Sequence, residues 1–182
     1  MFTATQLDIL VILNSRPDKE YHLSELGRLL GKCPGVFQRG INSLEKQGII
    51  ISHRRGNQRI FRINTGYSLY REIKRIVEKT GGAEAMLKKL ADSHKSVKIA
   101  LIYGSYARKK IRPDSDIDFL VAGDSSAEDV LLNKIGRMEK LLQREINYRI
   151  YSETEFNKKL KYGEPFLQEI LSSPYILLKG KL

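Results

Sequence analysis

Apolar residues at helical spacing mark three short segments at the start of the chain. Each segment repeats apolar side chains three or four positions apart, and each carries a signal for a helix end. Thr3 and Gln6 have the spacing of a capping box, and Gly31 and Gly48 stand where glycine commonly ends a helix. The pattern therefore predicts three helices, at residues 3–14, 23–30 and 34–47.

A basic β-hairpin is predicted directly after the third helix. The runs "IIISHRR" and "RIFRIN" are rich in β-branched residues and flank a turn-forming Gly-Asn pair. Three short helices followed by such a hairpin resemble a winged helix-turn-helix over about residues 1–66, and "PGVFQRGINSLEKQGII" resembles the recognition helix of that family.

The outward side chains of this segment suit contacts to double-stranded DNA. With Phe37, Ile41 and Leu44 facing inward, polar side chains of the third helix can reach base edges, and the hairpin arginines can neutralise phosphates. A solvated helix face is the alternative interpretation, and winged helices also serve as protein-docking modules. The candidate DNA-binding residues are Gln38, Arg39, Asn42, Ser43, Arg54, Arg55 and Arg59.

A helical connector is predicted at residues 67–95. Gly81-Gly82 ends its first helix, so the domain boundary is expected near residues 79–82. That helix can also serve as a dimerisation element, because many winged-helix regulators pair to match a two-fold operator, and we expect a homodimer. Its apolar stripe consists of Leu69, Ile73, Ile76 and Val77.

Two carboxylates stand in a predicted strand of the C-terminal half. "VKIALIY" and "SDIDFLVAG" are apolar strand candidates, and "REINYRIYS" is a third. Asp116 and Asp118 project from one face, because residues two apart share a face of a strand. Ionised carboxylates side by side repel each other and raise one another's pKa, so we expect a cation to offset the repulsion. Hard oxygen ligands of this kind suit Mg²⁺, or Mn²⁺.

A Gly-Ser pair before the carboxylates completes a candidate phosphate site. Gly104 at the strand end lets the chain approach a phosphate, and the start of the next helix offers free N–H groups. The hydroxyl of Ser105 can add a phosphate contact. Positive charge follows at Arg108, Lys109, Lys110 and Arg112.

The stretch "GSYARKKIRPDSDID" resembles the Gly-Ser…Asp-x-Asp signature of the nucleotidyltransferase superfamily related to DNA polymerase beta, and is most similar to its minimal type. The resemblance covers about residues 96–182. It implies that Gly104, Ser105 and Arg108 bind the phosphates of an NTP, and that Asp116 and Asp118 bind two divalent cations and catalyse nucleotidyl transfer with loss of pyrophosphate. The matching residues are Gly104, Ser105, Ala107, Arg108, Ser115, Asp116, Ile117 and Asp118.

The expected fold class is α+β, with a winged helix-turn-helix and a nucleotidyltransferase-fold α/β domain that has a small mixed sheet. An EF-hand starting at Asp114 fails, because Phe119 and Ser125 stand where glycine and glutamate are required. A phosphate loop of the Gly-Lys-Ser/Thr type is absent from the sequence. A solvent-facing acidic strand end is the remaining alternative.

One departure from the superfamily bears on turnover. Its third carboxylate position corresponds to Asn147, whose amide binds Mg²⁺ more weakly than a carboxylate and cannot act as a base. Glu145, two residues earlier, is the candidate substitute on the same face.

Charge and composition favour an anionic partner. The 182 residues carry a formal net charge of +11, and residues 1–82 hold 14 Lys and Arg against 7 Asp and Glu. An excess of this size is typical of binding to nucleic acid or to a membrane surface. Cys33 is the single cysteine, which excludes an internal disulfide framework, and no apolar run reaches the length of a membrane span. We expect a soluble, cytoplasmic protein without a membrane partner.

The sequence thus favours a DNA-binding transcriptional regulator whose second domain binds NTP and Mg²⁺ with weak or no turnover. One alternative is an active nucleotidyltransferase that transfers NMP to a protein or nucleic-acid acceptor. Another is a repressor whose second domain is only a dimerisation scaffold. Resemblance to the minimal type also suggests, by analogy, a toxin–antitoxin setting in which a partner protein is nucleotidylated.

Overall fold

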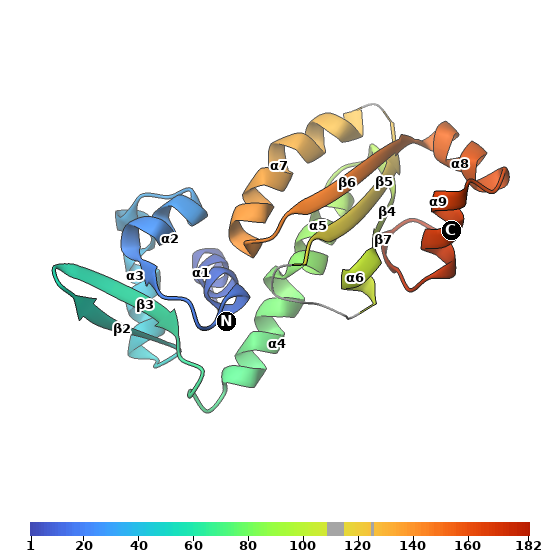
Figure 1. Cartoon of the computed structure of the whole chain (residues 1–182). Helices are drawn as coiled ribbons and strands as arrows, with labels where there is room; N and C mark the ends of the chain where they lie inside the picture. Colours follow the sequence, from blue (N-terminus) through green and yellow to red (C-terminus); the bar gives the residue numbers. More distant parts are fainter. Residues whose placement is uncertain (109–114, 125) are drawn as a thin grey trace. The chain divides into compact units, whose positions relative to one another are not determined.

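The chain folds into two compact units, each with its own small sheet (Figure 1). The computed structural model describes residues 1–108, 115–124 and 126–182. No helix in the described part of the chain is long and apolar enough to cross a membrane. The first unit comprises Met1–Gly82 and Lys140–Gln143, and the second comprises Ala83–Glu139 and Arg144–Leu182.

The first unit contains the predicted helices and hairpin. Its sheet is antiparallel with the strand order β1-β3-β2. The winged helix-turn-helix assignment stays a prediction, as do the domain limits 1–66, 67–95 and 96–182. The elements are α1 (Ala4–Ser15), β1 (Tyr21–His22), α2 (Leu23–Leu30), α3 (Pro34–Lys46), β2 (Ile50–Arg55), β3 (Gln58–Ile63) and α4 (Tyr70–Gly81).

Local signals fix the helix ends in this unit. The Thr3 hydroxyl accepts the N–H of Gln6, and the Thr3 N–H donates to Gln6 Oε1, so the predicted capping box is confirmed. Helix α2 ends at Gly31, which adopts φ +63° in the left-handed region. The two-residue strand β1 was not predicted, because Tyr21 and His22 are too few to show a strand pattern.

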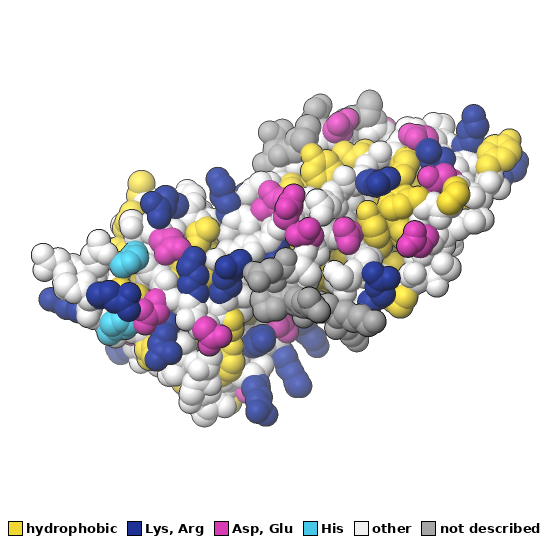
Figure 2. All heavy atoms as spheres, viewed as in Figure 1, with side chains coloured by type: hydrophobic (Ala, Val, Ile, Leu, Met, Phe, Trp, Pro, Cys, Tyr) yellow, Lys and Arg dark blue, Asp and Glu magenta, His cyan; other side chains and the backbone are white. Residues whose placement is uncertain are grey.

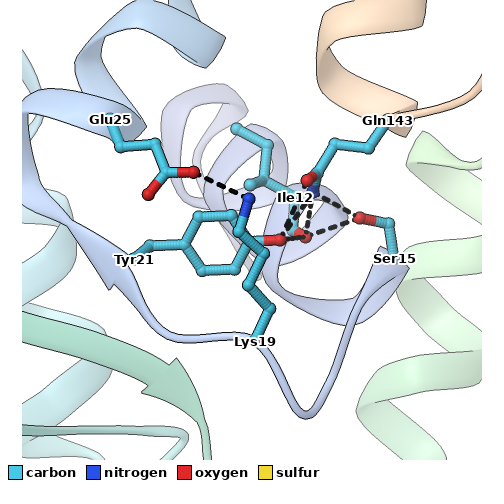
Figure 3. A network of polar contacts seen from close by, with 6 residues as sticks. All are labelled: Ile12, Ser15, Lys19, Tyr21, Glu25 and Gln143. Carbon is cyan, nitrogen blue, oxygen red and sulfur yellow. Dashed lines mark hydrogen bonds and ion pairs between the residues drawn. The ribbon is translucent and has the colours of Figure 1, made fainter.

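A partly buried glutamine network lies inside the first unit (Figure 3). Gln143, which directly follows α7 (Ser126–Leu142), has φ +51° and places its amide against α1 and β1. Its Nε2 lies 2.9 Å from the carbonyl oxygen of Ile12, 2.6 Å from Ser15 Oγ and 2.7 Å from the hydroxyl of Tyr21. Burial raises the pKa of that tyrosine, and its hydrogen bond with Gln143 partly offsets the rise. Residues distant in sequence therefore complete the polar core of this unit.

The second unit is built on a mixed four-stranded sheet of order β6-β5-β4-β7. Strands β5 and β6 are parallel and joined by α7, whereas β4 is antiparallel to both of its neighbours. The predicted α+β class with a small mixed sheet is thereby confirmed. The elements are α5 (Ala83–Asp92), β4 (Val97–Tyr103), α6 (Gly104–Ala107), β5 (Ile117–Gly123), α7 (Ser126–Leu142), β6 (Ile146–Ser152), α8 (Glu153–Lys161), α9 (Pro165–Ser172) and β7 (Ile176–Lys179).

One face of this sheet is covered by α8 and α9. Phe156 of α8 and Leu167 of α9 pack with alternate residues of β4, β5 and β6, such as Leu101 and Leu120, in one buried cluster. Tyr103 and Phe166 pack at the margin of that cluster. The apolar layer therefore stops at the end of the sheet where β5 and β6 begin and β4 ends.

Candidate functional site

The two predicted carboxylates lie where β5 begins. Asp118 is the second residue of β5 and is half-buried, while Asp116 precedes the strand and is exposed. The strand register places Asp118 between Tyr103, the last residue of β4, and Asn147 on β6. A row of polar side chains therefore crosses three strands at this end of the sheet.

Gly104 packs directly against the carboxylate of Asp118. It has φ +71°, and a Cβ added there would overlap Asp118 Oδ2 and lie 3.1 Å from Cγ. Both the backbone angle and the close approach therefore require glycine. The sequence predicts that Gly104 makes room for a phosphate, and the structure adds that it also makes room for this carboxylate.

The remaining predicted phosphate-binding residues follow Gly104 on the short helix α6. Ser105 is half-buried within that helix, and Arg108 follows it and is exposed. Burial raises the pKa of the Asp118 carboxyl, and the positive charge of Arg108 only partly offsets that rise. Lys109, Lys110 and Arg112, which the sequence analysis adds to this basic segment, lie outside the described residues.

The electrostatics of the carboxylate pair favour a bound cation. Burial, and next the charge of Asp116, raise the pKa of Asp118, and Arg108 only partly offsets this rise. Among the described residues no group of three or more His, Cys, Asp or Glu side chains can hold a metal. Two carboxylates nevertheless fit Mg²⁺, which commonly binds one or two of them and takes its other ligands from water and substrate phosphates.

Asn147, the residue that the sequence analysis expects at the third carboxylate position, contacts Asp116 directly. Its Nδ2 donates to Asp116 Oδ2 at 3.2 Å. Glu145, the candidate substitute, contributes its backbone oxygen, which accepts the N–H of Ile117 at 3.0 Å, and its side chain is exposed. The described part of the chain thus gives Asp116 an amide neighbour rather than a third acid.

Sequence analysis missed an aromatic and cationic cluster beside this row. The ring of Phe166, at the start of α9, meets the ring of Tyr103 edge-on with centroids 5.7 Å apart. The guanidinium of Arg149 on β6 lies over the ring of Phe166, 4.1 Å from its centroid. Strand alternation does place Arg149 on the face of Asn147, but only the packing of α9 brings Phe166 to it.

The candidate DNA-binding residues on α3 differ in whether their side chains already form hydrogen bonds. Phe37, Ile41 and Leu44 are fully buried, as predicted. Gln38 donates to Asn42 across one helical turn at 3.1 Å, and the hydroxyl of Ser43 accepts from Gln47 at 3.1 Å. Arg39 is exposed, and it forms no hydrogen bond or ion pair with any described residue.

Acidic side chains restrain two of the three hairpin arginines that are candidates for DNA binding. Arg55 pairs with Glu20 at 2.7 Å, and Arg59 pairs with Glu45 while lying over the ring of Phe61. Hydrogen bonding from Ser52 and then from Arg59 lowers the pKa of Glu45. Arg54, on the same hairpin, is exposed and forms no ion pair with a described residue. Figure 2 shows basic and acidic side chains interleaved over the visible face of this unit.

Comparison with known proteins assigns one of the two units. Residues 85–174 match the family model described as "Polymerase beta, Nucleotidyltransferase". These residues therefore form a polymerase beta-like nucleotidyltransferase domain, and the match of this family does not extend to the N-terminal unit.

Two solved structures are similar to parts of the chain. A toxin–antitoxin crystal structure with AMP-PNP is 18% identical, and the match covers 54% of this chain and 74% of that one with a TM-score of 0.38. A candidate nucleotidyltransferase from Sulfolobus solfataricus is 22% identical and covers 42% of this chain and 68% of its own, with a TM-score of 0.28. No curated protein sequence matches this chain.

Proposed function

We propose that the chain is a DNA-binding regulator whose polymerase beta-like nucleotidyltransferase domain binds a nucleoside triphosphate together with Mg²⁺ or Mn²⁺. The observation that carries the nucleotide part is the carboxylate pair of Asp116 and Asp118, of which Asp118 packs on Gly104, within a domain of this family. A half-buried Asp118 with a raised pKa beside a second acid is destabilising unless a cation binds.

Each residue of the site has a distinct role in this proposal. Asp116 and Asp118 supply the anionic oxygens for the metal, and Gly104, Ser105 and Arg108 receive the phosphates of the nucleotide. The bound metal would neutralise phosphate charge and stabilise the leaving pyrophosphate. Asn147 donates to Asp116 Oδ2, and the other oxygen of that carboxylate would remain available to a metal.

Weak or absent turnover follows from the chemistry of Asn147. An amide nitrogen that donates to Asp116 cannot remove a proton from an attacking hydroxyl. The intact Asp116/Asp118 pair favours the second candidate, an active enzyme that transfers NMP to a protein or nucleic-acid acceptor. Release of pyrophosphate in the presence of an acceptor would distinguish this enzyme from a nucleotide sensor.

The DNA-binding part of the proposal is supported by charge and exposure in the first unit. Arg39 on α3 and Arg54 on the hairpin are exposed and have no carboxylate partner among the described residues. Such arginines can bind phosphates without breaking existing ion pairs, unlike Arg55 and Arg59. This unit carries 14 Lys and Arg against 7 Asp and Glu in residues 1–82.

The homodimer belongs to the same proposal. Leu69 and Ile76, seven positions apart and therefore on one side of the α4 segment, are 52% and 49% exposed. Large apolar side chains at this spacing suit a partner helix of a second copy.

Calorimetric titration of ATP and GTP in the presence of Mg²⁺ tests the nucleotide part. The wild-type protein should bind, and an Asp116→Ala/Asp118→Ala variant should not. Absence of binding in both proteins would contradict nucleotide binding and favour a repressor whose second domain is only a dimerisation scaffold.

Fluorescence anisotropy with double-stranded DNA tests the DNA-binding part of the proposal. An Arg39→Ala/Arg54→Ala variant should bind more weakly and with a shallower salt dependence, by about 0.9 in log–log slope for each lost phosphate contact. Arg71→Ala/Arg75→Ala, which removes two exposed arginines from α4, is the matched charge control. An equal loss in the control would refute a specific role for α3 and the hairpin.

A further inference from the structure

We infer that Arg149 binds the phosphates of the nucleotide from the β6 side of the site, held in position by the ring of Phe166. This inference rests on the proposed nucleotide binding and adds a specific residue to it. It assigns the cationic cluster that neither the sequence motif nor the Gly104–Arg108 segment includes.

The strand register places Arg149 next to the carboxylate row. Arg149 follows Asn147 by two residues on β6, so both side chains leave the same face of the sheet. Arg149 pairs with Leu120, and Asn147 pairs with Asp118, so the two pairs are consecutive on that face. The chain therefore brings a cation to the margin of the candidate metal site.

The ring of Phe166 fixes the position of the guanidinium. The guanidinium carbon lies 4.1 Å from the ring centroid, a separation suited to stacking and cation–π attraction. Phe166 is itself restrained, because it packs against the buried cluster and meets Tyr103 edge-on. A planar group held on a restrained ring loses less conformational entropy when it binds a ligand.

The hydrogen-bond donors of Arg149 are available for a ligand. The side chain is exposed, and within the described ranges it forms no hydrogen bond or ion pair. By contrast, the arginines at positions 55 and 59 each pair with a glutamate. Stacking on Phe166 occupies one face of the guanidinium and leaves its N–H edge free, and that edge matches two oxygens of a phosphate.

Charge on the neighbouring groups supports an anionic occupant. Tyr103 lies between the two charges: it pairs with Asp118 in the strand register, and its ring meets the Phe166 ring on which Arg149 lies. A cation on the carboxylates together with Arg149 would give this margin a net positive charge, which suits a phosphate chain.

A nucleobase stacked on the open face of the guanidinium is the competing occupant. Stacking of a base would use none of the N–H donors of Arg149, whereas a phosphate would accept from them, so the geometry favours phosphate. The two occupants differ in one measurable respect, because inorganic triphosphate contains no base.

The test is calorimetric titration of the full chain with ATP and with inorganic triphosphate, both in the presence of Mg²⁺. Arg149→Met removes the charge and the donors while retaining a long apolar side chain. Lys98→Met is the matched control, because Lys98 is exposed and lies near the start of β4, away from Tyr103 at its end. Phe166→Leu tests the support by the ring, and circular dichroism confirms that each variant is folded.

Arg149→Met is expected to raise the dissociation constants of ATP and triphosphate alike, by about tenfold or more, as loss of a charge-assisted bidentate contact implies. Lys98→Met should leave both constants unchanged, and Phe166→Leu should raise both by a smaller factor. Weakened ATP binding with unchanged triphosphate binding would assign Arg149 to the base and overturn the inference. Unchanged binding of both ligands by Arg149→Met would also overturn it. A wild-type protein that binds neither ligand would instead overturn the proposed function, on which the inference depends.

Discussion

Replacement of Gly104 by alanine tests the packing at the centre of the site. The residue has φ +71°, where an alanine costs roughly 1–2 kcal/mol relative to glycine. The added methyl group would also overlap Asp118 Oδ2 and lie 3.1 Å from Cγ, so the carboxylate has to move. Overpacking of this kind adds about 1–3 kcal/mol. We therefore expect a loss of roughly 2–5 kcal/mol in the free energy of unfolding, together with weakened nucleotide binding.

Two other glycines separate the cost of the backbone angle from the cost of the steric overlap. Gly31 has φ +63° with no atom within 4 Å of an added Cβ, so Gly31→Ala carries the backbone cost without the collision. Gly136 lies in α7 with free space around it, so Gly136→Ala carries neither cost and should stabilise the helix by up to about 1 kcal/mol.

Urea unfolding followed by circular dichroism measures all three variants, and titration with ATP and Mg²⁺ measures their binding. Gly104→Ala should lose more stability than Gly31→Ala, and only Gly104→Ala should lose affinity for the nucleotide. An equal loss of stability in these two variants, with full nucleotide binding in both, would show that the Asp118 carboxylate is not packed on Gly104.

Further predictions concern the carboxylate row and the glutamine network. Because the folded-state pKa of Asp118 is raised, the protein loses stability as pH rises from the ordinary value of 3.8 through that raised pKa. Asp118→Asn should remove this loss and raise the free energy of unfolding at neutral pH, which urea titrations across the range will detect. Asn147→Asp replaces a donor to Asp116 by a third carboxylate, so Mg²⁺ affinity and pyrophosphate release should both increase in calorimetric and coupled assays. Gln143→Ala leaves the buried hydroxyl of Tyr21 without its amide partner and should cost about 1–3 kcal/mol in urea unfolding, whereas an unchanged midpoint would refute a stabilising role.

Local patterns in the sequence were sufficient to predict the helices and hairpin of the first unit, three strands of the second unit and the carboxylate pair. The capping box at Thr3 and the glycine at position 31 define helix ends through atoms a few residues apart. Asp116 precedes β5, but Asn147, the register partner of Asp118, donates to it, so the two carboxylates lie on one side of the sheet as the spacing predicts. The motif that contains them lies in the part of the chain that matches the nucleotidyltransferase family.

Contacts between distant segments were not predictable in the same way. The hydrogen bond from Asn147 to Asp116 depends on the register between β5 and β6, which the sequence of neither strand determines by itself. The stack of Arg149 on Phe166 depends on how α9 packs against the sheet. Pairing of a hairpin arginine with Glu20, in the segment before β1, similarly requires the folded first unit.

Lys140–Gln143 belong to the first unit although residues 83–139 of the second unit precede them. This arrangement limits how recombination can separate the two units. A recombination joint placed after Gly82 would transfer the first 82 residues to a new gene without Gln143. The fully buried Tyr21 and the carbonyl of Ile12 would then lose the amide that lies between them. Exchange of the N-terminal segment between genes is therefore disfavoured, and we expect the two units to descend together as a single evolutionary module.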